Sequence, residues 1–493
     1  MVEILKLFMS KGFFVDREVL SFFSSWKKEE VEKVIKILVD EGVKERIVTK
    51  GVISKYIDKF KENDLVLDLR ILSSVKFLYR RMVVGDFVRH FCSRYEILKN
   101  VLMRKREELS SIRKISGGRG FYNIIGMVAE KRITKNKNLL IEVEDLSGRV
   151  VVLVNNDKKD LFESAMSLML DDVVVFRVSG SGEMLFVNDI VFPEVGLDVE
   201  KIGDIDEYVA FSGDFHIGSK NFLESNVLRF VNWLNGGVGN ERQKQIARKV
   251  KCLILVGDMV DGVGVYSGQE SWLNIKDIKG QYKKLGEILG KIRKDVKIIM
   301  CAGQHDAVWV GEPQKTVSEK WAGDLYKIEN LKLVSNPTMV DFNGFKILMY
   351  HGASINRFID EMGGLRVEFG HKSPTRVVRE MLKRGHLAPM HGLMDYVPCE
   401  VDPMVIDVAP DIVATGDQHR AEVDCYNNIL MVASSCWQSV TPFEEKIGNV
   451  PEPCRVPLFN LKTREIKILD FSDEDIKWES GDDLVCKLEA GDV

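Results

Sequence analysis

Five short segments of the sequence place carboxylate and imidazole side chains beside glycine, each directly after an apolar run. Four of the chain's eight histidines lie in these segments. The residues that could do chemistry are Asp214, His216, Asp258, Asp261, Gln304, His305, His351, Asp417 and His419. Carboxylate, imidazole and amide groups in this mixture indicate a metal site.

The ligand types also restrict the metal and its chemistry. A set without thiolate suits Mn²⁺, Fe or Zn²⁺ better than an ion selected by sulfur. Two such cations, roughly 3.5–4 Å apart, can clamp the oxygens of an in-line displacement at phosphorus and generate a hydroxide nucleophile near neutral pH. A carboxylate between them supplies compact negative charge. The residues therefore predict a two-metal phosphoesterase site.

Each segment by itself has an ordinary explanation. A lone Asp-x-His is more often a turn with a surface histidine, and a lone Gly-Asp is usually only a turn. Five segments in order, each at the end of a strand-like run, are hard to explain without a shared site. We therefore expect them to meet at one metal centre.

The elements that must position these residues are strands of a layered α/β domain. Strand-like and helix-like stretches alternate between residues 205 and 471. In such sheets the carboxyl ends of the strands line the functional crevice. The apolar runs that precede the segments are 208–211, 252–256, 296–300, 345–350 and 412–414, and a terminal strand pair is expected at 456–461 and 465–471.

Residues 119–195 change to β patterning. Three strand-like runs, one helix-like run and two further strand-like runs give the order of an OB-fold β-barrel, which often binds nucleic acid. The aromatic side chains on which bases usually stack are not obvious. The sequence is equally compatible with a barrel that serves for packing and with a barrel that binds DNA.

The two ends of the chain have a different character. A helical repeat of apolar residues predicts a helical N-terminal domain over residues 1–95, which is either a plain bundle or a docking module. Residues 96–118 predict a basic linker, which is either solvated or in contact with phosphate. Residues 472–493 predict an acidic C-terminal tail. The apolar repeat comprises Val31, Val34, Ile35 and Leu38.

Bulk properties exclude several classes of protein. The 493 residues exceed one ordinary core, so several domains are expected. A net charge of −4 excludes a globally basic chain, so any DNA contact must come from local patches or from a partner. No run approaches the roughly 20 apolar residues that span a bilayer, and the N-terminus does not resemble a secretory signal. The eight cysteines form no CxxC pair, which favours a reducing, cytoplasmic location.

The order of the five segments resembles the calcineurin-like metallophosphoesterase superfamily, which includes nucleases of double-strand-break repair. With an OB-fold and a helical segment before it, the chain resembles the small subunits of archaeal family D DNA polymerases. The resemblance covers most of residues 119–471 and implies a four-layer α/β metallophosphoesterase domain. It extends to Arg384-Gly385-His386-Leu387-Ala388-Pro389, Asp402-Pro403 and Ala409-Pro410-Asp411-Ile412.

The resemblance assigns the candidate residues to two divalent metal ions, with Mn²⁺ foremost and Fe or Zn²⁺ as alternatives. It implies that Asp258 bridges both ions and that His305 faces the scissile phosphate as an acid or a charge stabiliser. Asp261 would hydrogen-bond His305 and hold its tautomer. The first metal would be held by Asp214, His216, Asp258 and His419, and the second by Asp258, Gln304, His351 and Asp417.

Two positions depart from the family pattern, and both belong to the second metal. The family has Asn where this chain has Gln304, and His where this chain has Asp417. Glutamine keeps the amide oxygen but adds a methylene, and aspartate replaces a nitrogen with an anionic oxygen. Both side chains can be ligands, so the changes predict either a preference for a harder cation or a weaker second site.

The resemblance implies the small, proofreading subunit of a replicative DNA polymerase, acting as a metal-dependent 3′→5′ exonuclease on DNA phosphodiesters. The implied partners are the large catalytic polymerase subunit, the single-stranded 3′ end of DNA and a sliding clamp. Two alternatives stay open. One is a non-catalytic scaffold subunit with a degenerate second metal site, and the other is a stand-alone metallophosphatase.

Overall fold

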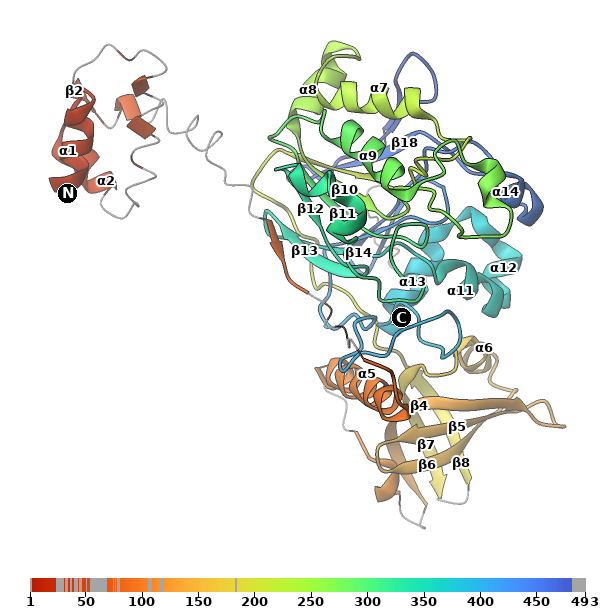
Figure 1. The fold of residues 1–493 in the computed structure, drawn as a ribbon. Helices are drawn as coiled ribbons and strands as arrows, with labels where there is room; N and C mark the ends of the chain where they lie inside the picture. Colours follow the sequence, from red (N-terminus) through yellow and green to blue (C-terminus); the bar gives the residue numbers. More distant parts are fainter. Residues whose placement is uncertain are drawn as a thin grey trace. The chain divides into compact units, whose positions relative to one another are not determined.

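The structure is a computed structural model, and it describes most of the chain. The chain divides into two compact units, Met1–Asp68 and Leu69–Val493, whose elements are labelled in Figure 1. Each unit is described by itself. The described residues are 2–23, 31, 34–35, 38–39, 43, 47–49, 51–53, 69–73, 75, 77, 80–104, 109–115, 119–181 and 184–480.

The first unit has a small apolar core of its own. Helices α1 (Val2–Ser10) and α2 (Arg17–Phe22) lie on either side of β1 (Phe14–Val15) in the sequence, and β1 pairs in parallel with β2 (Ile47–Val48). Phe8 and Phe23 contact each other in this core, with ring centroids 5.8 Å apart. The core also buries all four residues of the predicted helical repeat, Val31, Val34, Ile35 and Leu38.

The division after Asp68 differs from the helical domain predicted over residues 1–95. Strand β3 (Leu69–Ile71) pairs with a sheet strand of the second unit, β13 (Thr338–Phe342). Helix α5 (Val84–Arg104) packs its apolar face against the barrel of the second unit. Helical periodicity does not reveal which core a helix will cover, so the sequence pattern could not separate α5 from the first unit.

Both segments predicted as linker and tail contain regular structure. Helix α5 extends to Arg104, inside the predicted basic linker, and residues 105–108 and 116–118 of that segment lie outside the described residues. Strand β20 (Lys477–Ser480) lies inside the predicted acidic tail and pairs with β19 (Ile466–Asp470). Residues 481–493 lie outside the described residues.

Residues 120–191 form a closed barrel with strand order β4-β5-β6-β8-β7. Alternate side chains of its strands point inward and form one apolar core. Every run predicted here is found as the predicted type of element. The elements are β4 (Gly120–Ile133), β5 (Leu139–Asp145), β6 (Gly148–Val154), α6 (Lys159–Ser167), β7 (Val173–Ser181) and β8 (Met184–Val191).

The rest of the second unit is an α/β domain with two sheets. The seven-stranded sheet has the order β12-β11-β10-β9-β18-β19-β20 and is parallel from β12 to β9. The six-stranded sheet has the order β16-β17-β15-β14-β13-β3. The strands not yet given are β9 (Tyr208–Ser212), β10 (Val250–Val256), β11 (Lys297–Cys301), β12 (Leu331–Leu333), β14 (Phe345–Met349), β15 (Ile412–Thr415), β16 (Glu422–Tyr426), β17 (Ile429–Ala433) and β18 (Arg455–Asn460).

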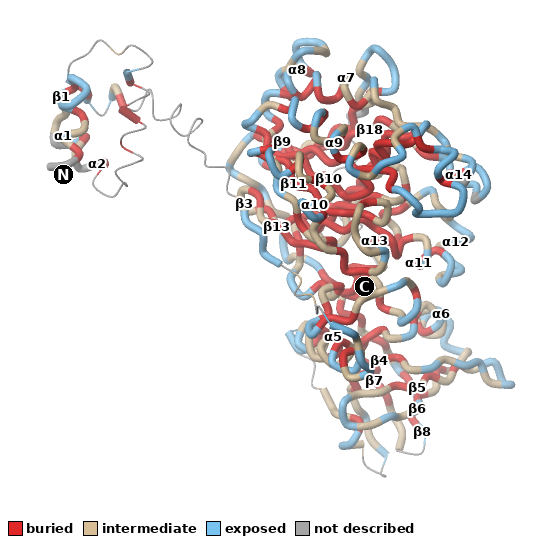
Figure 2. Tube along the Cα trace, in the orientation of Figure 1, coloured by how far each residue is buried: buried red, intermediate tan, exposed pale blue. Residues whose placement is uncertain are grey.

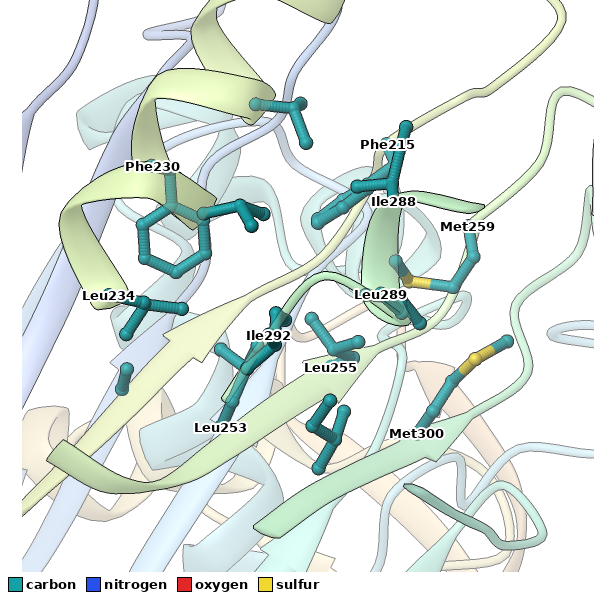
Figure 3. Close-up of a cluster of buried hydrophobic side chains, with 14 of the residues drawn as sticks. Phe215, Phe230, Leu234, Leu253, Leu255, Met259, Ile288, Leu289, Ile292 and Met300 are labelled. Carbon is teal, nitrogen blue, oxygen red and sulfur yellow. The ribbon is translucent and has the colours of Figure 1, made fainter. Parts of the chain in front are cut away.

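The two sheets lie between helices and contact each other. Rings of Phe345 on β14 and Phe459 on β18 lie 6.2 Å apart between the sheets. The seven-stranded sheet buries its other face under helices α7, α8 and α9, and Figure 3 shows part of that core. Helices α11 and α13 cover the six-stranded sheet in the same way, and the strands between these layers are largely buried (Figure 2). The helices of the domain are α7 (Glu224–Leu234), α8 (Glu241–Lys249), α9 (Ile278–Leu289), α10 (Glu319–Ala322), α11 (Ile355–Glu361), α12 (Gly363–Glu368), α13 (Pro374–Arg384) and α14 (Pro442–Ile447).

Local sequence signals define several of these elements. Strands β10 and β11 are almost continuous apolar runs, as expected for parallel strands with both faces covered. Helix α13 begins with Pro374, whose fixed φ suits the first turn, and ends at Gly385, which adopts a φ of +66°. The elements that carry the site are therefore specified by their own sequence.

A buried polar cluster fixes α5 to the segment 386–402. The Asp402 carboxylate oxygen Oδ2 lies 2.7 Å from Arg94 Nε, 3.2 Å from His90 Nε2 and 3.0 Å from His386 Nε2. All four side chains are at most 4% exposed. Such a cluster holds one arrangement of its elements, because losing any partner leaves a buried charge or donor without compensation.

Two further properties concern the chain as a whole. In the part of the chain that the structure describes, no helix is long and apolar enough to cross a membrane. Among the described cysteines, six carry free thiols, whereas Cys425 is disulfide-bonded. The disulfide was not expected from the scattered cysteines.

Candidate metal centre

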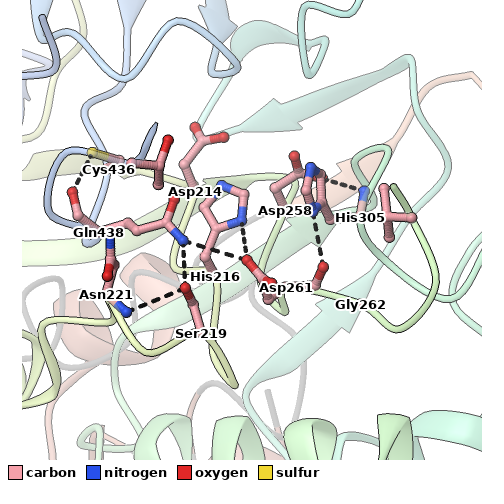
Figure 4. Close-up of polar contacts among 12 residues, drawn as sticks. Asp214, His216, Ser219, Asn221, Asp258, Asp261, Gly262, His305, Cys436 and Gln438 are labelled. Atoms are coloured by element: carbon pink, nitrogen blue, oxygen red, sulfur yellow. Dashed lines mark hydrogen bonds and ion pairs between the residues drawn. The ribbon is translucent and has the colours of Figure 1, made fainter. Parts of the chain in front are cut away.

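The five segments meet where the strands of the two sheets end. Asp214 and His216 follow β9, Asp258 and Asp261 follow β10, and His305 follows β11. His351 follows β14, and Asp417 and His419 follow β15. Figure 4 shows Asp214, His216, Asp258, Asp261 and His305 around one point. Three groups have ligand atoms within 4.8 Å of one another: Asp214, His216 and His419; His216, Asp258 and His305; and Asp214, Asp258 and His351.

The first group surrounds a point between two imidazoles. Nε2 of His216 and Nε2 of His419 lie 3.2 Å apart, and His419 Nε2 lies 3.6 Å from Asp214 Oδ1. On its far side, His419 Nδ1 lies 2.7 Å from Glu444 Oε1. A carboxylate oxygen accepts, so Nδ1 of His419 donates and its Nε2 is available as a ligand. The donor set therefore fits a cation.

His351 presents the same arrangement from the other sheet. Its Nδ1 donates to the carbonyl oxygen of Val256 at 2.7 Å. Its Nε2 lies 3.2 Å from Asp258 Oδ2 and 3.9 Å from Asp417 Oδ1, and is buried with no hydrogen-bond partner among the described residues. A nitrogen lone pair that faces carboxylate oxygens in a buried site requires a positive charge between them.

The electrostatics favour positive charge at this point. Burial opposes the charged imidazole, yet Asp258, Asp214 and Asp417 raise the pKa of His351 well above its usual value. Burial would raise the pKa of the Asp258 carboxyl, but His351 and His305 outweigh it and hold that pKa well below its usual range. The carboxylates thus attract a cation, whether a proton or a metal.

The two residues that depart from the family pattern differ in their surroundings. Asp417 Oδ2 accepts from Asn356 Nδ2 at 3.1 Å and Gln418 Nε2 at 2.7 Å, which leaves Oδ1 facing His351. Burial, together with Asp214 and Asp258, raises the pKa of Asp417. Gln304 lies half-buried in the loop after β11, next to His305. Oδ1 of Asp417 therefore faces His351, although Asp417 belongs to none of the three groups.

Asp261 contacts two imidazoles through different groups. Its backbone carbonyl accepts from His305 Nδ1 at 2.8 Å, so the predicted bond to His305 is made by the main chain and not by the carboxylate. The carboxylate instead lies 3.3 Å from His216 Nδ1. Buried amides hold it there: Gln269 Nε2 donates to Oδ2 at 3.0 Å and Gln438 Nε2 to Oδ1 at 3.4 Å. The Asp261 side chain therefore faces His216, and its carbonyl faces His305.

The backbone of the site is unusual. Five of its residues other than glycine adopt the left-handed region, which costs an L-amino acid roughly 1–2 kcal/mol. Their φ values are +49° at Asp214, +51° at His216, +48° at Asp258, +65° at Asp417 and +56° at His419. Strained residues of this kind persist where the surroundings over-determine them, and they gather at functional sites.

Glycine is needed where the site loops touch. A Cβ on Gly303 would overlap Asp258 Oδ1, and a Cβ on Gly416 would lie 2.6 Å from Asp214 Oδ2. Both glycines therefore let the backbone approach a ligand carboxylate.

Several residues that complete the site were not expected from the sequence: Glu444, Gln269 and Asn356. Glu444 lies at the third position of α14 and forms a capping box with Thr441 while its other oxygen holds His419. In the sequence, such a glutamate indicates only a helix start. No spacing rule links these residues to the five segments.

Comparisons with known proteins bear on the whole second unit. Residues 209–424 match the model of the B-subunit family of DNA polymerases alpha and epsilon. The DNA polymerase II small subunit of Methanothermobacter thermautotrophicus is 38% identical over 393 residues, which cover 79% of this chain and 80% of that protein. The DNA polymerase II small subunit of Thermoplasma acidophilum is 30% identical over 484 residues, covering 95% and 93%.

Among solved structures, the phosphoesterase Yfce from E. coli matches 55% of this chain and 98% of its own, with 11% identity and a TM-score of 0.28. That score is too low to support a conclusion.

The two sheets, the carboxylate and imidazole groups gathered at their strand ends and the sequence matches define the second unit as a domain similar to the B subunits of DNA polymerases. Within that class, the chain belongs to the family of archaeal DNA polymerase II small subunits, also called the family D small subunits.

Proposed function

We propose that the chain is the proofreading subunit of its polymerase, a Mn²⁺-dependent 3′→5′ exonuclease that hydrolyses DNA phosphodiesters. The observation that carries the proposal is the convergence of buried carboxylates and imidazole lone pairs on one point at the strand ends. In the proposed assignment Asp258 bridges two ions. The first ion is held by Asp214, His216, Asp258 and His419, and the second by Asp258, Gln304, His351 and Asp417.

The residues of this chain would then have distinct tasks. When bound, two divalent cations would supply charge neutralisation at phosphorus and a nucleophile near neutral pH. Glu444 and Val256 keep the ligand histidines in the tautomer that presents Nε2. His305 is held by the Asp261 carbonyl and keeps Nε2 for a phosphate oxygen. Fixed groups of this kind stabilise the developing charge without reorganising.

We also propose the partners and the domain roles. Family membership supports assembly with the large catalytic polymerase subunit. The proposal further includes action on single-stranded 3′ ends at the cytoplasmic replication machinery and a sliding clamp as a partner. The strand order β4-β5-β6-β8-β7, with α6 between β6 and β7, supports an OB-fold assignment for residues 119–195. Residues 205–471 form the proposed nuclease domain.

The test removes the bridging carboxylate. Asp258→Asn suits a left-handed position, because asparagine tolerates positive φ, so the loop should keep its conformation. We expect Mn²⁺-dependent loss of nucleotides from labelled single-stranded DNA to fall to background. Asp198→Asn, an exposed aspartate outside the site, is the matched control. Full nuclease activity of Asp258→Asn would contradict the assignment of the chain as a metal-dependent nuclease.

A scaffold role is the second candidate, and Asp417 favours it. One Asp417 oxygen is occupied by two amide donors, so the second metal position has a weaker set of ligands than the family pattern. The assay that separates the two candidates is nuclease activity of the purified complex, since both predict assembly. Parallel assays on a phosphomonoester and on DNA distinguish the third candidate, a stand-alone phosphatase.

A further inference from the structure

A loop next to the metal centre carries exposed aromatic and apolar side chains. Residues 262–272 follow Asp261 and end in the short 3-10 helix η3 (Gln269–Trp272). The loop contains one charged residue, Glu270. It exposes Val263 (44%), Val265 (39%), Tyr266 (48%) and Trp272 (42%). Tyr266 and Trp272 therefore present part of their aromatic rings to solvent on a loop with a single charged residue.

The loop is fixed to the site at both ends. Gln269 is only 1% exposed, and its Nε2 donates to the Asp261 carbonyl at 2.8 Å and to Asp261 Oδ2 at 3.0 Å. Its Oε1 accepts from Val265 N at 2.9 Å. At the far end, the Trp272 carbonyl accepts from Lys220 N at 2.9 Å, four residues after His216. The loop therefore lies between the segments that carry His216 and His305.

Tyr266 lies close to the chemistry. A Cβ on Gly262 would overlap the His305 carbonyl oxygen and approach Val265 to 2.7 Å, so the loop packs directly against the His305 segment. Burial and the Asp261 carboxylate together raise the pKa of Tyr266. The ring thus stands within the field of the carboxylate that faces His216, while almost half of it remains exposed.

The chemistry of the loop selects among ligands. Binding of phosphate would need cations, and the loop has none. The nearby cations are exposed: Lys220, whose backbone N–H donates to the Trp272 carbonyl, and Lys276, four residues after Trp272. Flat aromatic rings bind the faces of bases, and only unpaired bases offer both faces. We propose that residues 262–272 form a stacking platform for the terminal base of an unpaired DNA strand, with Tyr266 and Trp272 as its rings. This inference rests on the proposed nuclease function and names the substrate feature that the site would read.

The experiment compares two strands that differ only in the terminal base. One single-stranded DNA ends in a normal 3′ nucleotide, and the other ends in an abasic 3′ nucleotide. The full-length chain is assayed with Mn²⁺ as wild type, Tyr266→Ala, Trp272→Ala and the conservative variants Tyr266→Phe and Trp272→Phe. Tyr326→Ala, an exposed tyrosine of the same domain, is the matched control.

We expect each alanine variant to raise KM for the normal strand about 5- to 150-fold, the factor that corresponds to stacking of one base, with kcat little changed. KM for the abasic strand and Mn²⁺ affinity should stay at the wild-type values, and both phenylalanine variants should retain most of the discrimination. A loss of equal size on both strands, or no loss on either, overturns the platform while the nuclease assignment stands.

Failure of the nuclease assignment would be recognised separately. If the wild type degrades neither strand, equilibrium binding of the two strands in Ca²⁺ decides about the platform. The platform is supported if the wild type binds the normal 3′ end more tightly than the abasic end and Tyr266→Ala loses this difference in affinity. Equal affinity of the wild type for both strands overturns the platform.

Discussion

At the scale of single residues, oxygen atoms outside the centre determine which ring nitrogen of each site histidine carries the proton. The carbonyl oxygen of Val256 accepts from His351, the carbonyl oxygen of Asp261 accepts from His305, and a carboxylate oxygen of Glu444 accepts from His419. Oxygens of these kinds accept hydrogen bonds and do not donate them. Each imidazole therefore carries its proton on Nδ1 and turns Nε2 inward. The ligand geometry depends on these acceptors as much as on the ligands.

Glu444 offers the cleanest test of this dependence. Glu444→Gln keeps an oxygen for the α14 cap but removes the charge that holds His419 Nδ1. Changes to such supporting groups typically weaken metal affinity about 10- to 100-fold, and we expect Mn²⁺ affinity to fall within that range. Titration calorimetry measures it. The neighbouring exposed Glu445→Gln should bind as the wild type does, and equal affinity of both variants would contradict the dependence.

Asp417 permits a test of the second metal. An anionic oxygen suits a harder cation than an imidazole nitrogen does. We expect Asp417→His to shift the preference of the protein from Mn²⁺ toward Zn²⁺, whereas Gln304→Asn, which keeps the amide oxygen, should leave that preference unchanged. Competitive titration of the two metals and anomalous diffraction from soaked crystals measure preference and occupancy. An unchanged preference in Asp417→His would mean that Asp417 is not a ligand.

The sequence predicted the residues that come together but not those that hold them. Asp214, His216, Asp258, His351 and His419 each follow an apolar strand, and sheet geometry brings such ends together. Gln269 and Glu444 reach the site from a loop or a helix start, where nothing local marks them. Their role arises from tertiary contact, which a single sequence does not encode in any spacing.

At the scale of elements, α5 is joined to the rest of the second unit through Asp402, which also accepts a hydrogen bond from the neutral His386. His386 Nε2 donates to Asp402, and His386 Nδ1 accepts from Ala388 N at 2.9 Å. A second proton on Nδ1 would break that bond and add charge beside Arg94. Burial and Arg94 lower the pKa of His386 to about 4.

The depressed pKa makes this contact sensitive to acid. Below the ordinary histidine value near 6.5 the unfolded chain binds a proton that the folded chain excludes, so stability falls as pH drops from about 6.5 toward 4. We expect His386 to contribute a loss of about 2 kcal/mol between pH 7 and pH 5. His386→Gln should reduce the corresponding drop in thermal midpoint by a few degrees, and the exposed His391→Gln should not. The same drop in both variants would contradict the assignment.

Strands were predicted more reliably than domain limits. The apolar runs of both sheets and of the barrel appear as strands, because a buried strand must be apolar along its own length. The limit near residue 95 fell inside α5, because an amphipathic helix carries the same pattern whichever core it covers. Assignment of a helix to a domain therefore required the fold.

At the scale of the whole molecule, the candidate metal ligands come from both sheets of the second unit. Asp214 and Asp258 come from one sheet, and His351 and His419 come from the other. Bound metal would therefore contribute to stability, because only the folded state assembles this set of ligands.

Removal of metal gives the corresponding prediction. A ligand present at a hundred times its Kd stabilises the folded state by about 2.7 kcal/mol. We expect a chelator to lower the thermal midpoint of the full-length chain and Mn²⁺ to restore it. Asp258→Asn should respond to neither addition. An unchanged midpoint in the wild type would mean that the centre binds no metal under those conditions.

The left-handed conformation of five site residues lowers stability at positions that the proposed activity requires. Glycine in place of Asp417 or His419 would relieve about 1 kcal/mol of backbone strain at each position and would also remove a buried charge or donor. Random mutation screened only for thermal tolerance, with a chelator present, should therefore enrich glycine at these loops, whereas a screen for copying fidelity should reject it. Comparison of the two screens would therefore show whether the polymerase requires these ligand residues, without a nuclease assay.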